Sequence, residues 1–292
     1  MAARPSDRSL FRTLAVGGVM AWLLVFVAAP NLLVLGASLA SRGEAEFLAL
    51  PLSLHSYGHL LSPLFAGVFA DSFVLAAGTT LLCLVVGYPF AYILARLPRA
   101  RLPKARPLLL LLVIIPFWTN SLIRTYALVF ILKTEGLLND LLLGLGLASE
   151  PLSLLYTDTA VFVGLTYTLL PFMILPLYAS IEKLDERLLE AARDLGASRP
   201  RVFWRITVPL TAPGIAAGCM LVFLPSFCLF YIPDILGGAK TLLVGNFIKN
   251  QFLSARDWPL GSAASMLLTA VMALLAVVRL KLSPLAGEKV RR

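Results

Sequence analysis

The stretch EKLDERLLEAARDLGASRPRVFWRITVP, from Glu182 to Pro209, decides the fold, because it is a charged segment between two apolar ones. Gly196 stands where a left-handed residue ends a helix, and Ser198 can cap a second helix that tolerates Pro200 in its first turn. Apolar residues follow helical spacing in each half. They are Leu184, Leu188, Ala191, Ala192 and Leu195 in the first half, and Val202, Phe203 and Ile206 in the second. The stretch therefore predicts two short helices joined by a turn, with Pro209 and Pro213 marking the exit into the next apolar run.

The composition places these helices between membrane spans. Of 292 residues, 59% are hydrophobic and 14% are charged, whereas soluble domains carry about a quarter charged residues. A helix of roughly 20 apolar residues crosses a bilayer core of ~30 Å. The expected fold is one all-α integral membrane domain over residues 1–292, with six transmembrane helices and a loop at 183–209 between the fourth and fifth. The expected spans are 13–41, 72–95, 107–131, 159–181, 210–233 and 258–280.

Two other segments with few charges are not expected to span. Residues 47–70 hold prolines, histidines and serines, which favours an extracytoplasmic segment. Residues 137–147 favour a short interfacial helix. The first apolar stretch is too long for the core of a signal peptide and lacks a cleavage pattern, so we expect a permanent anchor.

Basic residues indicate the orientation. With both termini cytoplasmic, 19 of the 25 lysines and arginines fall on the inner side, as the positive-inside rule requires. The loop at 183–209 then faces the cytoplasm. The net charge of +9 follows from this topology and requires no nucleic acid.

The sequence shows no catalytic constellation. It lacks a phosphate-binding glycine loop, a metalloprotease motif and a nucleophile elbow. His55 and His59 have no third ligand nearby, so no metal site is expected. The cysteines, Cys83, Cys219 and Cys228, fall within expected spans as small apolar residues.

The amphipathic hairpin suits a groove on a partner protein. Glu190 and Asp194 lie four residues apart on one face and can bind the backbone or basic groups of that groove. The alternative is a helix lying in the lipid headgroup layer. The acidic residues of the helix, Glu190 among them, suit an anionic lipid surface poorly.

Glu190-Ala191-Ala192, then Gly196, then Ile206-x-Val208-Pro209 resembles the EAA motif of binding-protein-dependent ABC permeases, with Val208 in place of a leucine. The resemblance implies a fold like that of type I ABC importers and a coupling helix that sits in a cleft of an ATP-binding subunit. It assigns ATPase coupling to Glu190, Ala191, Ala192, Asp194, Gly196 and Phe203.

Longer segments resemble the first permease subunit of spermidine/putrescine ABC importers. They are Gly87–Tyr92, Pro116–Arg124, Ser180–Asp185, Gly238–Lys240 and Arg256–Pro259. The resemblance implies a bacterial inner-membrane heterodimer with a second permease, two ATP-binding subunits and a periplasmic polyamine-binding protein, surrounded by lipid. ATP and magnesium would bind the ATPase, so this chain is expected to hold no cofactor and to work by alternating access.

A polycation needs carboxylates and aromatic faces, since cation–π contacts contribute ~0.5–2 kcal/mol each. Phe227, Tyr231 and Asp234 have the spacing of one helix face, with Asp234 roughly 31 Å along the axis from Pro213. They are expected to line the outer mouth of a substrate pathway. Alternatively, Tyr231 belongs to an interfacial aromatic belt and Asp234 caps the helix.

The third expected span carries three further candidates. Trp118 is expected to line the pathway and Asn120 to bond across helices. Arg124, costly within a membrane, is expected to be an interfacial anchor or an ion-pair partner of Asp234 or Asp257. Two tyrosines four residues apart in the second span are further pathway candidates, namely Tyr88 and Tyr92.

Two kinds of alternative stay open. The same machine can carry another solute, such as oxidised iron or an anion. A secondary transporter or channel would instead show inverted repeats and broken helices in both halves, which the sequence does not indicate.

Overall fold

The computed structural model describes residues 5–43, 52–97, 105–238, 240 and 242–288, and within these ranges every regular element is a helix. The predicted all-α class is confirmed there. The chain forms two compact units, one from Met1–Ala66 and Phe247–Leu282 and the other from Gly67–Asn246 and Ser283–Arg292. The predicted basic cluster at Arg99, Arg101 and Lys104 lies outside the described residues.

Five helices are long and apolar enough to cross a membrane, and a sixth span results if one sharply bent pair counts as a single crossing. The five are Thr13–Leu39, Pro63–Arg96, Asp158–Glu182, Arg199–Cys228 and Trp258–Arg279. Most of the exposed large hydrophobic side chains lie on these helices. Such apolar surfaces suit a lipid environment or another membrane subunit.

The first unit contains the first and last of these helices. The first is continuous through α1 (Pro5–Leu23), a π-helical segment η1 (Leu24–Ala28) and α2 (Ala29–Leu39), and the last is α14 (Trp258–Glu288). Two short helices accompany them, α3 (His55–Leu60) and part of α13 (Val244–Leu253). A hydrogen bond of 2.8 Å between Ser38 Oγ and Tyr57 Oη ties α2 to α3.

The second long helix, α4 (Pro63–Arg96), begins earlier than the predicted residue 72. Ser62 explains the early start, because its side-chain oxygen accepts a hydrogen bond from Phe65 N at 3.4 Å. Proline is favoured in the first turn that follows such a cap. Residues 63–70, which were predicted to lie outside the spans, therefore belong to a helix long enough to cross a membrane. Residues 47–51 of the same predicted segment lie outside the described residues.

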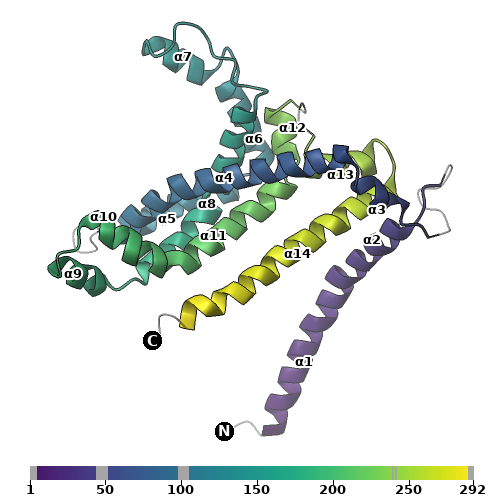
Figure 1. Ribbon diagram of the computed structural model, residues 1–292, viewed down its shortest axis with the longest axis horizontal. Coiled ribbons are helices and arrows are strands. Elements are labelled where there is room, and N and C mark those ends of the chain that lie inside the picture. The colour runs from purple at the N-terminus through teal and green to yellow at the C-terminus, as the bar shows by residue number, and fades with distance from the viewer. Residues whose placement is uncertain (1–4, 44–51, 98–104, 239, 241, 289–292) are drawn as a thin grey trace. The chain divides into compact units, whose positions relative to one another are not determined.

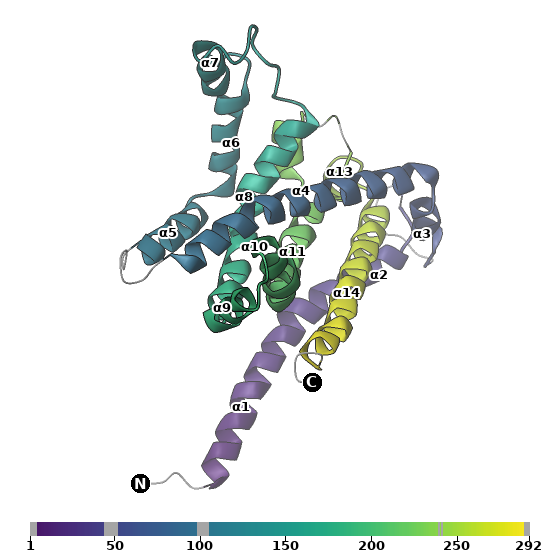
Figure 2. The same ribbon diagram turned by 60° about the vertical axis from the view of Figure 1, so that its left-hand side comes forward.

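The predicted third span over 107–131 is not one continuous helix. The chain forms α5 (Ala105–Ile114), a 3₁₀ turn η2 (Ile115–Trp118) and α6 (Ser121–Leu132), with a bend of 98° between the two parts (Figure 2). Pro116 lacks the N–H that a continuing helix needs. Asn120 Oδ1 then accepts from Leu122 N at 2.8 Å and starts a new helix. The predicted short helix at 137–147 forms as α7 (Leu137–Gly144).

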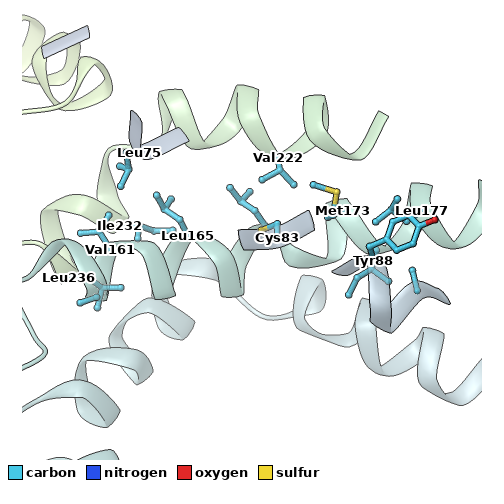
Figure 3. Close-up of a cluster of buried hydrophobic side chains, with 14 of the residues drawn as sticks. Leu75, Cys83, Tyr88, Val161, Leu165, Met173, Leu177, Val222, Ile232 and Leu236 are labelled. Carbon is cyan, nitrogen blue, oxygen red and sulfur yellow. The ribbon is translucent and has the colours of Figure 1, made fainter. Parts of the chain in front are cut away.

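The core of the second unit lies between α4, α8 (Asp158–Glu182) and α11 (Val208–Cys228). Helices α8 and α11 run side by side (Figure 1). Glycines permit this close approach, since a Cβ added at Gly214 would lie 2.4 Å from Ser180 Cβ and one at Gly218 would lie 2.6 Å from Met173 Sδ. The buried cluster contains Leu75 and Cys83 of α4, Leu165 and Met173 of α8, and Val222 of α11 (Figure 3).

The fifth span differs from the predicted 210–233 at both ends. It continues without interruption from α10 (Arg199–Val202) through a π-helical segment η3 (Phe203–Thr207) into α11. Pro209 therefore stands inside the helix start and marks no exit from it. At the other end α11 stops at Cys228, Leu229 is extended, and α12 (Tyr231–Leu236) begins anew. Pro233 favours this restart, because a proline is tolerated in the first turn of a helix.

Candidate functional site

The predicted hairpin forms at one end of α8 and α11 and consists of α9 (Glu186–Asp194) and α10 (Figure 1). Asp185 caps α9 by accepting from Arg187 N at 3.0 Å. At the other end Gly196 has a φ of +84°. Gly196 N donates to Arg193 O at 2.8 Å and Ala197 N donates to Ala192 O at 3.0 Å. This is a Schellman motif, so the prediction that Gly196 ends the helix as a left-handed residue is confirmed.

The second helix of the hairpin starts at the predicted place. Ser198 occupies the N-cap position, but its side chain makes no capping hydrogen bond. Val202 is 3% exposed and anchors the helix in the unit. The start therefore depends on backbone geometry and on Pro200 in the first turn.

Helix α9 has two contrasting faces. Leu189 is 5% exposed and packs inward, whereas Leu188 is 50% exposed and Leu195 is 89% exposed. Ala191 is also exposed. Most of the apolar stripe that the sequence predicted therefore faces away from the rest of the described chain. An exposed apolar stripe beside charged residues is typical of a protein-binding surface.

The inward face of α9 borders a cleft of about 230 Å³. Its lining residues are Tyr92, Arg96, Glu186, Leu189, Glu190 and Arg193. Glu190 therefore lies beside two arginines of this same chain, while Asp194 is exposed at the end of α9. The sequence predicted that Glu190 and Asp194 share one face that binds a partner. In the structure Glu190 also lines a cleft within this chain.

Phe203 joins the hairpin to α4. Its ring centroid lies 5.6 Å from that of Tyr88 and 6.3 Å from that of Tyr92. The Tyr88 hydroxyl is hydrogen-bonded to Thr211 Oγ1 at 3.0 Å in a buried environment. The structure thus brings both tyrosines to the base of the hairpin, where they have packing partners that the sequence did not indicate.

The three candidates of the broken third span have different environments. Trp118 is 76% exposed at the bend. Asn120 caps α6, the helix it precedes, and makes no hydrogen bond to another helix among the described residues. The guanidinium Cζ of Arg124 lies 5.8 Å from the ring centroid of Tyr167. Among the described residues Arg124 forms no ion pair with Asp234, so that predicted pair is not present.

Asp257 has a different partner from the one expected. Its carboxylate lies 3.4 Å from Arg42 Nη1 and accepts from Leu260 N at 3.1 Å, within the first unit. Asp257 therefore caps the start of α14 and holds the end of the first span.

The predicted single helix face of Phe227, Tyr231 and Asp234 is wrong, because α11 ends between Phe227 and Tyr231. Phe227 is 2% exposed and contacts Phe69 with ring centroids 5.1 Å apart. Asp234 instead accepts a hydrogen bond from Asn246 Nδ2. Asn246 is 3% exposed and also donates to Phe230 O at 3.1 Å. Asn246, in α13, therefore holds the start of α12.

No motif in the sequence indicated Asn246 or four charged residues at the ends of spans. The four are Arg96, Arg106, Glu182 and Glu186, which form two ion pairs. Their opposite charges beside the ends of spans were visible in the sequence. Their pairing depends on how the helices pack.

No group of three or more histidine, cysteine, aspartate or glutamate side chains within the described residues has a geometry suited to a metal ion. The two histidines of α3 approach each other, with 3.0 Å between His55 Nε2 and His59 Nε2. A closed zinc site takes four ligands.

Residues 87–283 match the family described as binding-protein-dependent transport system inner membrane component. The match begins in α4 and includes the hairpin. The chain belongs to this family of inner-membrane transport components. Its membership confirms the resemblance that the EAA-like motif carried.

Similar proteins cover nearly the whole of this inner membrane component. The Escherichia coli (strain K12) spermidine/putrescine transport system permease protein PotB is 53% identical over 272 residues, 93% of this chain and 98% of that protein. PotB of Salmonella typhimurium (strain SL1344) is 52% identical over 284 residues, 97% of this chain and 98% of that protein. The solved structure of a bacterial ABC transporter that imports the acidic polysaccharide alginate matches with a TM-score of 0.73 and 18% identity. The match covers 98% of this chain and 96% of the alginate transporter chain, so the two chains share a fold.

Proposed function

We propose that this permease moves spermidine and putrescine into the cytoplasm as one of two membrane subunits of an ABC importer. The observation that supports the substrate class is the identity of 52% over 97% of the chain with a spermidine/putrescine permease. Its partners are a second permease, two ATP-binding subunits and a periplasmic polyamine-binding protein. ATP and magnesium bind the ATPase, and this chain contributes no catalytic group.

The hairpin of α9 and α10 is the surface on which the ATP-binding subunit docks. Two features support this proposal, namely the exposed apolar face with Leu188 and Leu195, and the rigid Schellman end at Gly196. The charge distribution supports a cytoplasmic position for the hairpin and for both termini. An amphipathic helix that fills a hydrophobic groove is a common mode of recognition.

Movement of the docked hairpin switches the access of the pathway between the two permeases. Helices α8 and α11 pack closely through Gly214 and Gly218, so a shift of the hairpin displaces both helices together. Packed helices respond to such a shift as rigid bodies between discrete arrangements. Alternating access follows when ATP binding closes the partner subunits.

Carboxylates and aromatic rings near the helix breaks suit a polyamine better than an anion. Asp234 and Tyr231 lie at the start of α12, and Trp118 is exposed at the α5–α6 bend. Protonated amines are attracted by both carboxylates and aromatic faces. We therefore propose these three residues as parts of the polyamine pathway, whereas Phe227 is buried against Phe69.

The function is tested by reconstituting the permease pair with its ATPase and binding protein in liposomes. We expect spermidine or putrescine, with the binding protein present, to stimulate ATP hydrolysis and to accumulate in vesicles oriented for import. Molybdate and ferric iron serve as competing solutes. Stimulation by one of these solutes and not by either polyamine would leave the importer intact and refute the substrate.

The pathway is tested with Asp234→Asn, which keeps the size of the side chain and removes its charge. We expect uptake to fall at least about fivefold at low polyamine concentration while the four-component complex still assembles. Asp140→Asn, at an exposed carboxylate of α7, is the matched control. Uptake kinetics equal to those of the parent would remove Asp234 from the pathway.

A further inference from the structure

Two arginines on either side of the α4–α5 connection each meet a glutamate beside the hairpin. Arg96 Nη1, in the last turn of α4, lies 2.7 Å from Glu186 Oε1 at the start of α9. Arg106 Nη1, in the first turn of α5, lies 3.7 Å from Glu182 Oε1 at the end of α8. The arginine side chains are only 17% and 13% exposed. Charges this buried are retained in proteins when they are paired.

Arg106 also holds the end of α4. Its Nε donates to Leu97 O at 2.9 Å and its Nη2 donates to Ala95 O at 2.5 Å. Helix ends leave carbonyl groups without intrahelical partners, and a cation there is favourable. One side chain therefore connects α4, α5 and α8.

Arg96 depends on a single acceptor. Its Nε and Nη2 are buried and have no hydrogen-bond partner among the described residues, and its Cζ lies 5.8 Å from the Tyr92 ring centroid. Glu186 is 66% exposed and is hydrated far more readily than Arg96, which is 17% exposed. Removing the glutamate would leave a largely buried cation with only an aromatic ring beside it.

These ion pairs matter because some helices are joined to the hairpin by the chain itself, whereas others touch it only through side chains. The chain joins α9 directly to α8 and, through α10, to α11. Helices α4 and α5 have no such covalent link to the hairpin, so movement reaches them only through side-chain contacts. Coupling between distant sites requires contiguous physical contacts of this kind.

We propose that the pairs Arg96–Glu186 and Arg106–Glu182, named the clamp here, transmit the movement of α9 to α4 and α5. This inference rests on the proposed function, in which an ATP-binding subunit moves α9. The four residues of the clamp act as positioning residues, because they hold α4 and α5 against the hairpin and α8. The clamp lets α5, with the bend that follows it, move together with α8 and α11 when the hairpin shifts.

The experiment exchanges the charges of the better-formed pair in the reconstituted importer. Arg96→Glu, Glu186→Arg and the double variant are compared by the number of polyamine molecules taken up per ATP hydrolysed. We expect each single variant to lower this ratio at least about fivefold while ATP hydrolysis continues. The double variant should recover about half of the parent ratio, because the opposite charges again face each other.

Two further variants show whether a lowered uptake ratio is specific to the clamp. Glu186→Gln, which keeps the side-chain shape, should lower the same ratio even if a reversed variant fails to assemble. Lys133→Glu, at an exposed lysine after α6, is the matched charge reversal and should leave the ratio unchanged. Single variants with the parent ratio, or a double variant no better than the singles, would overturn the clamp. If the parent complex shows no polyamine-stimulated hydrolysis of ATP, the proposed function is wrong, and this outcome is distinguishable from a failure of the clamp alone.

Discussion

At Gly196 the backbone has a φ of +84°, a conformation that costs a residue with a side chain ~1–2 kcal/mol. A Cβ there would meet nothing within 4 Å, so the cost comes from the backbone alone. We expect Gly196→Ala to destabilise the hairpin by about 1–2 kcal/mol and Gly196→Asn to cost less, since asparagine tolerates this conformation better. Limited proteolysis between α9 and α10 measures the effect. Equal cleavage rates for the alanine, asparagine and parent proteins would contradict the argument.

A substitution at Tyr88 can test whether this residue has a structural role or lines the substrate pathway. It is 8% exposed, and its hydroxyl bonds to Thr211, which also donates to Thr207 O at 2.8 Å. Tyr88→Phe keeps the packing on Phe203 and loses one hydrogen bond, which costs ~0.5–1.5 kcal/mol. We expect a small fall in melting temperature and parental uptake kinetics. A fall in polyamine affinity without loss of stability would instead return Tyr88 to the substrate pathway.

At the scale of elements, the α8–α11 pair depends on glycine. A Cβ at Gly214 would lie 2.4 Å from Ser180 Cβ and 2.9 Å from Pro176 O, and the backbone atom cannot turn aside. We expect Gly214→Ala to cost ~1–3 kcal/mol through overpacking and to lower the melting temperature in detergent. Gly36→Ala, where a Cβ meets nothing within 4 Å, is the control and should be neutral or stabilising. A Gly214→Ala protein as stable as the control would show that the helices can separate without cost.

Features that depend on local chemistry were predictable from the sequence, whereas features that depend on packing were not. The helix end at Gly196 follows from one residue that tolerates positive φ, and it was predicted correctly. The break at Asn120 was also encoded locally, by a proline and a capping asparagine, but apolar composition outweighed it in a search for uninterrupted spans. The partners of Asp234 and Arg96 required the packing of segments far apart in the sequence, which no local pattern contains.

At the scale of the whole molecule, the exposed apolar residues distinguish surfaces suited to lipid from surfaces suited to a partner protein. The first span and α4 present exposed apolar residues along their length, whereas α9 presents a short apolar stripe next to charged residues. Uninterrupted apolar surface suits a bilayer, and a small apolar stripe in a polar setting suits a protein groove. This contrast supports the proposed function, in which the hairpin docks onto the ATP-binding subunit.

This distinction predicts the behaviour of Leu195, which is 89% exposed at the end of α9. Burying a leucine contributes ~1.5–3 kcal/mol, so Leu195→Glu should weaken ATPase binding at least about tenfold. Co-purification of the ATP-binding subunit from detergent at several salt concentrations measures the loss. Leu61→Glu, at a leucine that is 87% exposed before α4, matches the change and should retain the ATPase. Because Leu195 contacts little within its own chain, the variant should keep the parental melting temperature, and full retention of the ATPase would place the docking surface elsewhere.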